Sequence, residues 1–203
     1  MSEVKEGKLL YHVTALENME SILTEGILSR VAVNNKNILQ KDVANSEIIQ
    51  KRESLDILQY VPFHFFEKTP FTGTVFNNHT DTTFCTITIR RDFARRNNFK
   101  ICTAHPLSKN PEAEVFDYDE GFAAIDWKSL EKRDYHDERS KNVCMAECLA
   151  ISPVKPKDFH SICVPTEKIR NKIKELATKL LGTYSFHIDV REWCTQEGKH
   201  DYL

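Results

Sequence analysis

The chain has 203 residues, of which 40% are hydrophobic and 29% are charged, and its formal net charge is −2. This size and composition fit one soluble globular domain, which we expect to span residues 1–203. No apolar run reaches the length of a membrane span, which excludes a transmembrane protein, and the slight negative charge disfavours tight, unspecific binding of DNA by the whole surface.

Several common site motifs are absent from the sequence. None of the six cysteines has C-x-x-C spacing, so we expect buried, reduced thiols and no metal site. There is neither a G-x-G-x-x-G segment nor a Walker loop, which excludes Rossmann and P-loop nucleotide sites. Residues 1–8 are polar and lack a secretory apolar core, so we expect a cytoplasmic protein.

The first predicted unit is a strand followed by a short helix. Residues 9–14 have strand character, and Thr14 with Glu17 fits a capping box that starts a helix ending at Gly26. Residues 30–59 are polar and weakly patterned, with a helical stretch around Ile48. Long segments of this kind within compact domains are often functional loops.

The middle of the chain predicts more strands with a helix between them. Residues 60–66 and 82–90 are rich in β-branched and aromatic side chains, and Asp92 can cap a short helix. We expect residues 103–118 to be irregular and Gly121 to lie in a turn.

The last third predicts strands over residues 143–151, 160–164 and 186–190. A helix capped by Thr166 and ended by Gly182 separates the last two. The mixed order of elements indicates an α+β domain whose strands are largely antiparallel.

Glu147 is the sharpest candidate for chemistry. Strand alternation places it among Val143, Met145, Leu149 and Ile151, on the bulky apolar face of the predicted strand. A buried carboxylate without a partner is costly, so Glu147 should be paired or should line a cleft. A salt-bridged structural glutamate explains the pattern equally well, and the pattern leaves both readings open.

A second group of polar residues lies near the N-terminus. His12 and Thr14 share a strand face, and Asn18 follows one turn into the predicted helix. Helix N-termini and adjacent polar groups bind anions and ribose hydroxyls. The alternative is that Thr14 only caps the helix and His12 packs in the core.

Basic residues form a third group of candidates. Lys51 and Arg52 are adjacent, and a second cluster of basic residues is interleaved with phenylalanines. Arginine and aromatic side chains together suit single-stranded nucleic acid, although charge runs are more often solvated surface. The candidates for contact with nucleic acid are Lys51, Arg91, Arg95, Arg96 and His105.

Taken in order, these residues resemble the DarT family, the toxin half of a toxin–antitoxin pair, over nearly the whole chain. The matching segments are Leu10–Thr14, Ile49–Arg52, Tyr60–Phe65, Ile125–Trp127 and Met145–Leu149. The resemblance implies an ADP-ribosyltransferase fold with a central NAD cleft and flanking helices. It also implies a single-stranded DNA substrate, NAD as co-substrate and a macrodomain antitoxin of the DarG kind that removes the modification.

The resemblance also implies roles for individual residues. The family's catalytic glutamate falls on Glu147, which is expected to hold a ribose hydroxyl, stabilise the cationic sugar and help remove the proton of the base. Arg52 is expected to support the pyrophosphate or the transition state. His12, Thr14 and Asn18 are expected to hold NAD.

Three departures from the family pattern bear on the target base. Residues 102–106 replace an expected Thr-Asp-Gly-His segment, residues 139–142 carry fewer arginines, and Met145 replaces a glutamine. The thymine-modifying branch carries those features, so we expect guanine to be favoured over thymine. Transfer to RNA or protein, and a non-catalytic nucleotide-binding module, remain open alternatives.

Overall fold

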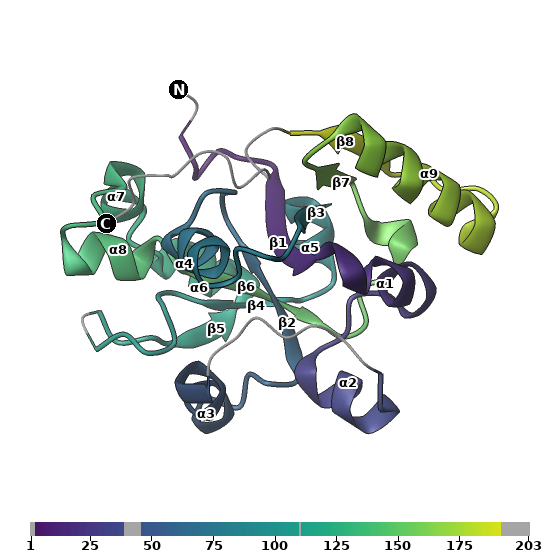
Figure 1. Ribbon diagram of the computed structural model, residues 1–203. Helices are drawn as coiled ribbons and strands as arrows, with labels where there is room; N and C mark the ends of the chain where they lie inside the picture. Colours follow the sequence, from purple (N-terminus) through teal and green to yellow (C-terminus); the bar gives the residue numbers. More distant parts are fainter. Residues whose placement is uncertain (1–2, 39–45, 110, 192–203) are drawn as a thin grey trace.

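A computed structural model describes residues 3–38, 46–109 and 111–191 (Figure 1). In these residues eight strands form one mixed sheet in the order β5-β4-β6-β2-β1-β3-β7-β8. The strands are β1 (Leu9–Ala15), β2 (Tyr60–His64), β3 (Phe84–Arg90), β4 (Lys100–Cys102), β5 (Val115–Asp117), β6 (Glu147–Ile151), β7 (Ser161–Val164) and β8 (His187–Val190).

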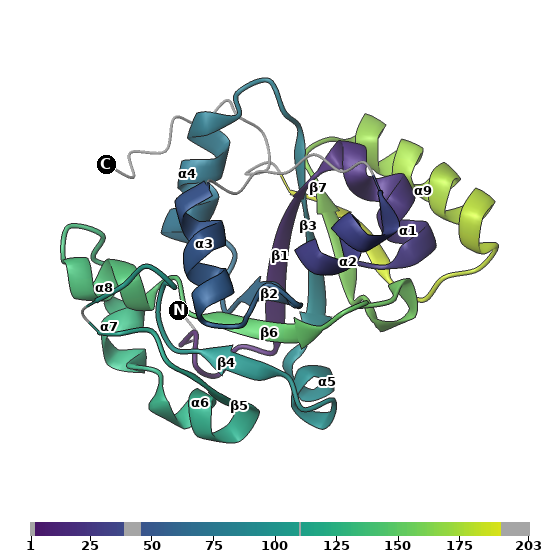
Figure 2. The same ribbon diagram turned by 90° about the horizontal axis from the view of Figure 1, so that it is seen from below.

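The helices lie at the ends and over the faces of this sheet. They are α1 (Met19–Glu25), α2 (Arg30–Lys36), α3 (Ser46–Ser54), α4 (Pro70–Asn78), α5 (Arg91–Arg96), α6 (Tyr118–Ala124), α7 (Trp127–Lys132), α8 (Glu138–Val143) and α9 (Glu167–Leu181). Figure 2 shows α6, α7 and α8 grouped beside β4 and β5, whereas α9 covers β7 and β8 at the opposite end. None of the described helices is both long and apolar enough to cross a membrane.

The sheet is weakly joined in its middle. Strand β1 pairs with β3 along all seven of its residues, but it meets β2 through one pair, Tyr11 and His64. Figure 2 shows the consequence, because β1 and β3 run across the direction of β6 and β4. Every neighbouring pair is antiparallel except β7 and β8. The α+β class with largely antiparallel strands is therefore confirmed.

The parallel pair is made possible by α9. Parallel neighbours need a crossover connection, and α9 supplies it between β7 and β8. The Thr166 side chain accepts a hydrogen bond from the Ile169 backbone N–H, and Gly182 follows the last turn with a φ of 70°. Both predicted ends of this helix are confirmed.

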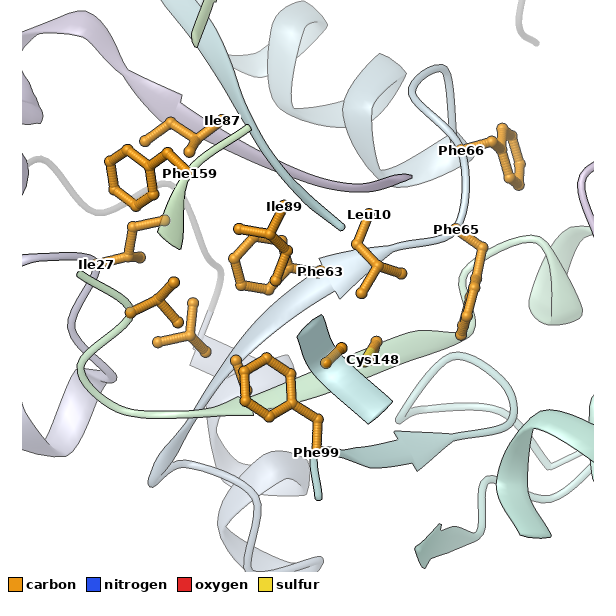
Figure 3. Close-up of a cluster of buried hydrophobic side chains, with 14 of the residues drawn as sticks. Leu10, Ile27, Phe63, Phe65, Phe66, Ile87, Ile89, Phe99, Cys148 and Phe159 are labelled. Atoms are coloured by element: carbon orange, nitrogen blue, oxygen red, sulfur yellow. The ribbon is translucent and has the colours of Figure 1, made fainter. Parts of the chain in front are cut away.

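The main core lies between the sheet and its covering helices. Figure 3 shows Leu10, Phe63 and Ile89 close together, and each is fully buried. Five of the six cysteines are buried and unpaired, as expected, while Cys194 lies outside the described residues. Burial raises the pKa of the Cys85 thiol to about 12, so this thiol is an inert part of the core.

Several predicted element ends are wrong. Thr14 caps no helix, because it belongs to β1 and a 3₁₀ turn at Leu16–Asn18 precedes α1. Asp92 lies inside α5, whose N-cap is Arg90, and its carboxylate accepts from the next backbone N–H instead.

Gly121 also lies in a helix rather than in a turn. It is part of α6, and a side chain at this position would meet Cβ of Ile101 at 2.7 Å. The glycine therefore serves the close approach of α6 to β4. The segment 103–118, predicted to be irregular, contains the short strand β5.

The predicted strand over residues 143–151 starts too early, because α8 ends at Val143 and residues 144–146 connect it to the strand. Asp137 accepts hydrogen bonds from the backbone N–H groups of Arg139 and Ser140, and this cap starts α8, which runs to Val143. The strand β6 then begins at Glu147. Glu147 therefore lies at the entrance of its strand, directly after a tight connection.

Candidate active site

A cavity of about 330 Å³ lies at the weak junction between the two halves of the sheet. Strands β1, β2 and β6 line it from the sheet side, and helices α1, α2, α3 and α4 contribute the remaining walls. Its lining includes five residues predicted from the sequence: His12, Thr14, Asn18, Arg52 and Glu147. These residues come from distant parts of the chain, so folding alone brings them together.

The lining of the cavity includes a buried ion pair. Nη1 of Arg52, on α3, lies 2.5 Å from Oε2 of Glu147, the first residue of β6. Arg52 is 8% exposed and Glu147 is 5% exposed. Each charge compensates the other in a place where either alone would be costly. Glu147 is therefore salt-bridged and also lines the cavity, so both interpretations of the sequence pattern hold.

Part of the Arg52 guanidinium has no partner among the residues that the structure describes. Its Nη2 atom is buried and makes no hydrogen bond to any described residue. Buried polar groups are normally satisfied, and an exception within a pocket indicates a place where a ligand can accept. The unmatched donor is therefore a candidate contact for a ligand in the cavity.

His12 enters the cavity as a neutral ring. Its Nδ1 atom lies 2.9 Å from the carbonyl oxygen of Pro62. A carbonyl can only accept, so Nδ1 carries the proton and Nε2 remains an acceptor. Burial lowers the pKa of His12 to about 4, because the charged ring would lose its hydration. The ring also packs against Phe63, with centroids 5.3 Å apart.

Thr14 and Asn18 form a short polar pair on the same wall. The Asn18 side-chain amide donates to Oγ1 of Thr14 at 3.2 Å, and both residues are buried. The 3₁₀ turn after β1 folds Asn18 back over Thr14. The hydroxyl of Thr14 is thereby held beside Asn18, the residue directly before α1.

The sequence did not single out His64, which lies at the end of β2. It is 6% exposed, lines the cavity and is the direct cross-strand neighbour of Glu147. Burial lowers the pKa of its imidazole. The alternation of Tyr60, Pro62 and His64 was a signal for a shared face, and all three residues do line the cavity.

Two candidates for contact with nucleic acid lie near the pair. Lys51 directly precedes Arg52 on α3 and is half-buried. His105 does not line the cavity, yet burial lowers its pKa and the Glu147 carboxylate acts against that shift. His105 therefore lies within electrostatic reach of Glu147.

The assignment of Arg91 to nucleic acid is wrong. Its guanidinium is buried and donates to three backbone carbonyl oxygens, those of Lys5, Leu9 and Phe65. It also lies over the Phe65 ring, 5.1 Å from the centroid. Arg91 thus holds the N-terminal segment against the sheet and is not accessible to a DNA strand.

Arg95 and Arg96 are exposed but do not line the cavity. They lie on α5 and pair with Asp119 and Asp92. Such exposed pairs contribute little to stability. Within the residues described, no group of three or more histidine, cysteine, aspartate or glutamate side chains could hold a metal ion.

Residues 11–193 match the model of the family described as "ssDNA thymidine ADP-ribosyltransferase, DarT". A DNA ADP-ribosyl transferase–DNA ADP-ribosyl glycohydrolase fusion protein of Thermosipho africanus is 22% identical over 175 residues. That match covers 82% of this chain and 45% of the fusion protein, so the chain spans less than half of this relative.

Solved structures share the fold. The DarT of Thermus sp. 2.9 in complex with ADP-ribosylated ssDNA matches with a TM-score of 0.76 and 16% identity, over 94% of this chain and 97% of that chain. The same protein in complex with NAD⁺ matches with a TM-score of 0.73 and 16% identity, over 94% and 98%. With the family model matching most of its length, this chain belongs to the DarT family of ssDNA ADP-ribosyltransferases.

Proposed function

We propose that this chain cleaves NAD and transfers its ADP-ribose to a base of single-stranded DNA, releasing nicotinamide. The observation that carries the proposal is the buried Arg52–Glu147 pair, set in a cavity that also presents His12, Thr14 and Asn18. Membership of the DarT family and the NAD⁺ and ssDNA complexes of the Thermus protein support this reading.

NAD binding would use the β1 side of the cavity. The free Nε2 acceptor of His12 suits a hydroxyl or amide donor, and the Thr14–Asn18 pair supplies further polar atoms beside it. Because His12 stays neutral down to about pH 4, its role does not depend on protonation near pH 7. These three residues would orient the ribose and nicotinamide end of the dinucleotide.

The ion pair would serve the bond cleavage. Departure of nicotinamide leaves positive charge on the ribose, as in other glycosyl transfers with oxocarbenium-like transition states. Oε2 of Glu147 is held by Arg52, which leaves Oε1 for a ribose hydroxyl and for stabilising that charge. The Nη2 group of Arg52 would bind the pyrophosphate or the transition state through charge-assisted hydrogen bonds.

The acceptor would be an unstacked base. A cavity of about 330 Å³ with a buried reactive pair cannot act on a base inside a duplex, so a single strand is the cheaper substrate. Lys51 and His105 lie close enough to the pair to contact an approaching strand. Arg95 and Arg96, on α5, would at most contact its more distant part.

We favour guanine as the acceptor base, whereas the description of the family names thymidine. The support lies in the three departures at residues 102–106, residues 139–142 and Met145. Met145 lies two positions before Glu147, the first residue of β6, so a change there would alter the surroundings of the reacting atoms.

The direct test is a mass measurement. The chain is incubated with NAD and single-stranded oligonucleotides that lack either G or T, and the product is examined for the mass of one added ADP-ribose. We expect modification only where G is present. Modification that follows T instead contradicts the choice of base.

The same assay tests the enzymatic proposal as a whole. We expect Glu147→Ala to lower the rate by about a hundredfold or more, since the loss of such an electrostatic group has effects of this size. RNA and protein acceptors run in parallel would reveal another substrate. Binding of NAD without release of nicotinamide would identify a non-catalytic module and overturn the proposal.

The proposal extends to a partner and a compartment. The fusion protein from Thermosipho africanus combines a transferase with a DNA ADP-ribosyl glycohydrolase by name. We therefore expect an antitoxin of that activity, of the macrodomain kind, to reverse the modification made by this chain. Five buried, unpaired thiols suit a reducing cytoplasm, where both NAD and DNA are present.

A further inference from the structure

We propose that His64, and not Glu147, accepts the proton that the base loses when its nitrogen bonds to the ribose. The inference rests on the proposed function and assigns one step of it. The sequence did not single out this residue, and the register of β2 against β6 is what brings it to the site.

The position of His64 meets the geometric requirement. His64 and Glu147 face each other across neighbouring antiparallel strands, and directly opposed residues project from the same side of a sheet. Both line the cavity, and His64 is 6% exposed. An imidazole therefore lies beside the carboxylate that is proposed to hold the ribose.

The ring is oriented by its protein contacts. Its Nδ1 atom lies 3.4 Å from the carbonyl oxygen of Ala146, and the ring packs on Phe71 with centroids 5.3 Å apart. Since the carbonyl can only accept, the proton belongs on Nδ1 and the lone pair on Nε2. A neutral imidazole with a free Nε2 is the form in which a histidine acts as a general base.

Glu147 is less suited to receive this proton. Its Oε2 is bound to Arg52, and its other oxygen is required for the ribose. A proton on the carboxylate would also leave the buried Arg52 without its counter-charge, which is strongly unfavourable. This cost is avoided when His64 accepts the proton and Glu147 holds the ribose.

The charged neighbours of His64 come from every side of the cavity. Burial is the largest influence and lowers its pKa, Glu147 on β6 raises it, and Arg52 on α3 lowers it. His64 in turn lowers the pKa values of His12 on β1 and of His105. The net direction is downward, so His64 is uncharged at neutral pH and ready to accept.

The step balances in atoms and in charge. The bond between the ribose C1′ and the nicotinamide nitrogen breaks, and its electron pair stays on nicotinamide. The lone pair of the base nitrogen forms the new bond to C1′, and the proton of that nitrogen moves to Nε2 of His64. Nicotinamide leaves as a neutral molecule, so the positive charge that its ring carried in NAD is replaced by the charge of the protonated His64. His64 then releases the proton to solvent.

The test compares transfer rates with NAD binding in the full chain. We expect His64→Gln to lower the rate of ADP-ribose transfer to an oligonucleotide by about 100-fold, the lower range for general-base catalysis, with the Kd of NAD unchanged. The parent should lose activity in acid, at a pH below the ordinary histidine pKa of about 6.5 because burial lowers the pKa of His64, and His64→Gln should lack this loss. His187→Gln, an exposed histidine on β8, is the matched control and should behave as the parent.

Chemical rescue separates a base from a merely structural ring. In His64→Ala, added imidazole should restore transfer, and the restored rate should follow the fraction of neutral imidazole. If thermal unfolding shows that His64→Gln does not fold, the rescue of His64→Ala by imidazole still tests the assignment. A His64→Gln rate within threefold of the parent, or a folded, NAD-binding His64→Ala chain that imidazole leaves inactive, overturns the assignment. If the parent itself transfers nothing, the proposed function fails instead.

Discussion

Arg52 and Glu147 are 95 positions apart in the chain, yet they form an ion pair in the lining of the cavity. Helix α3 supplies the cation and strand β6 supplies the anion. Each is buried, so neither charge is tolerated there without the other.

This dependence predicts strong coupling in stability. Arg52→Met or Glu147→Leu alone should lower the free energy of unfolding by about 3 kcal/mol, because each leaves a buried charge without its partner. The double variant should be at least as stable as the more stable single variant, since both charges are then gone. Urea unfolding of the four proteins measures the coupling, and simple addition of the two single costs would contradict it.

Stability should also depend on pH through His12. Its pKa is about 4 in the folded chain and near 6.5 when unfolded, so the unfolded chain binds the proton first as the pH falls. The folded state should therefore lose on the order of 3 kcal/mol between about pH 6.5 and pH 4, with no effect of this group above that window. His12→Asn should flatten the profile of unfolding free energy against pH; an unchanged slope would show that His12 is hydrated.

We expect Arg91 to contribute to the stability of the fold and not to the binding of DNA. Its three hydrogen bonds to carbonyl oxygens and its contact with Phe65 are all internal, so Arg91→Leu should cost about 3 kcal/mol. Arg96→Ala, at an exposed position on α5, should cost less than about 1 kcal/mol. Thermal unfolding of the two variants makes the comparison, and equal midpoints would refute it.

Two glycines with positive φ form another matched pair. Gly26 has a φ of 89°, and an added Cβ would lie 2.6 Å from the carbonyl oxygen of Val154. Gly182 has a φ of 70°, but a Cβ there meets nothing within 4 Å. We expect Gly182→Ala to cost about 1 kcal/mol and Gly26→Ala clearly more, because only the latter adds a steric clash to the backbone strain. Denaturant unfolding measures both losses, through the midpoints when the dependence of the unfolding free energy on denaturant is unchanged. Equal losses of unfolding free energy in the two variants would contradict the clash.

Local signals in the sequence predicted much of the fold. Alternation in β1 and β8, the cap at Thr166 and the glycine after α9 each depend on a few neighbouring residues, and each was identified. The start of β6 was missed because the apolar residues 144–146 connect α8 to the strand, and an apolar run alone does not show where a strand begins.

The site was predictable to a smaller extent. Residue type and local pattern singled out Glu147 and His12, and the structure places both in one cavity. The partner of Glu147 was not predictable from pattern, since Arg52 lies 95 positions away in the chain. His64 was missed for the same reason, because its meeting with Glu147 depends on the register of two strands 82 residues or more apart.

The separation of Arg52 and Glu147 has a consequence for the cell that makes this protein. A ribosome that has added the arginine must add 95 more residues before the matching carboxylate exists. Products of premature termination before that point hold only half of the pair and present no finished cavity. Under the proposed function, chains that end before β6 should therefore transfer no ADP-ribose, and only chains extended past Glu147 should do so.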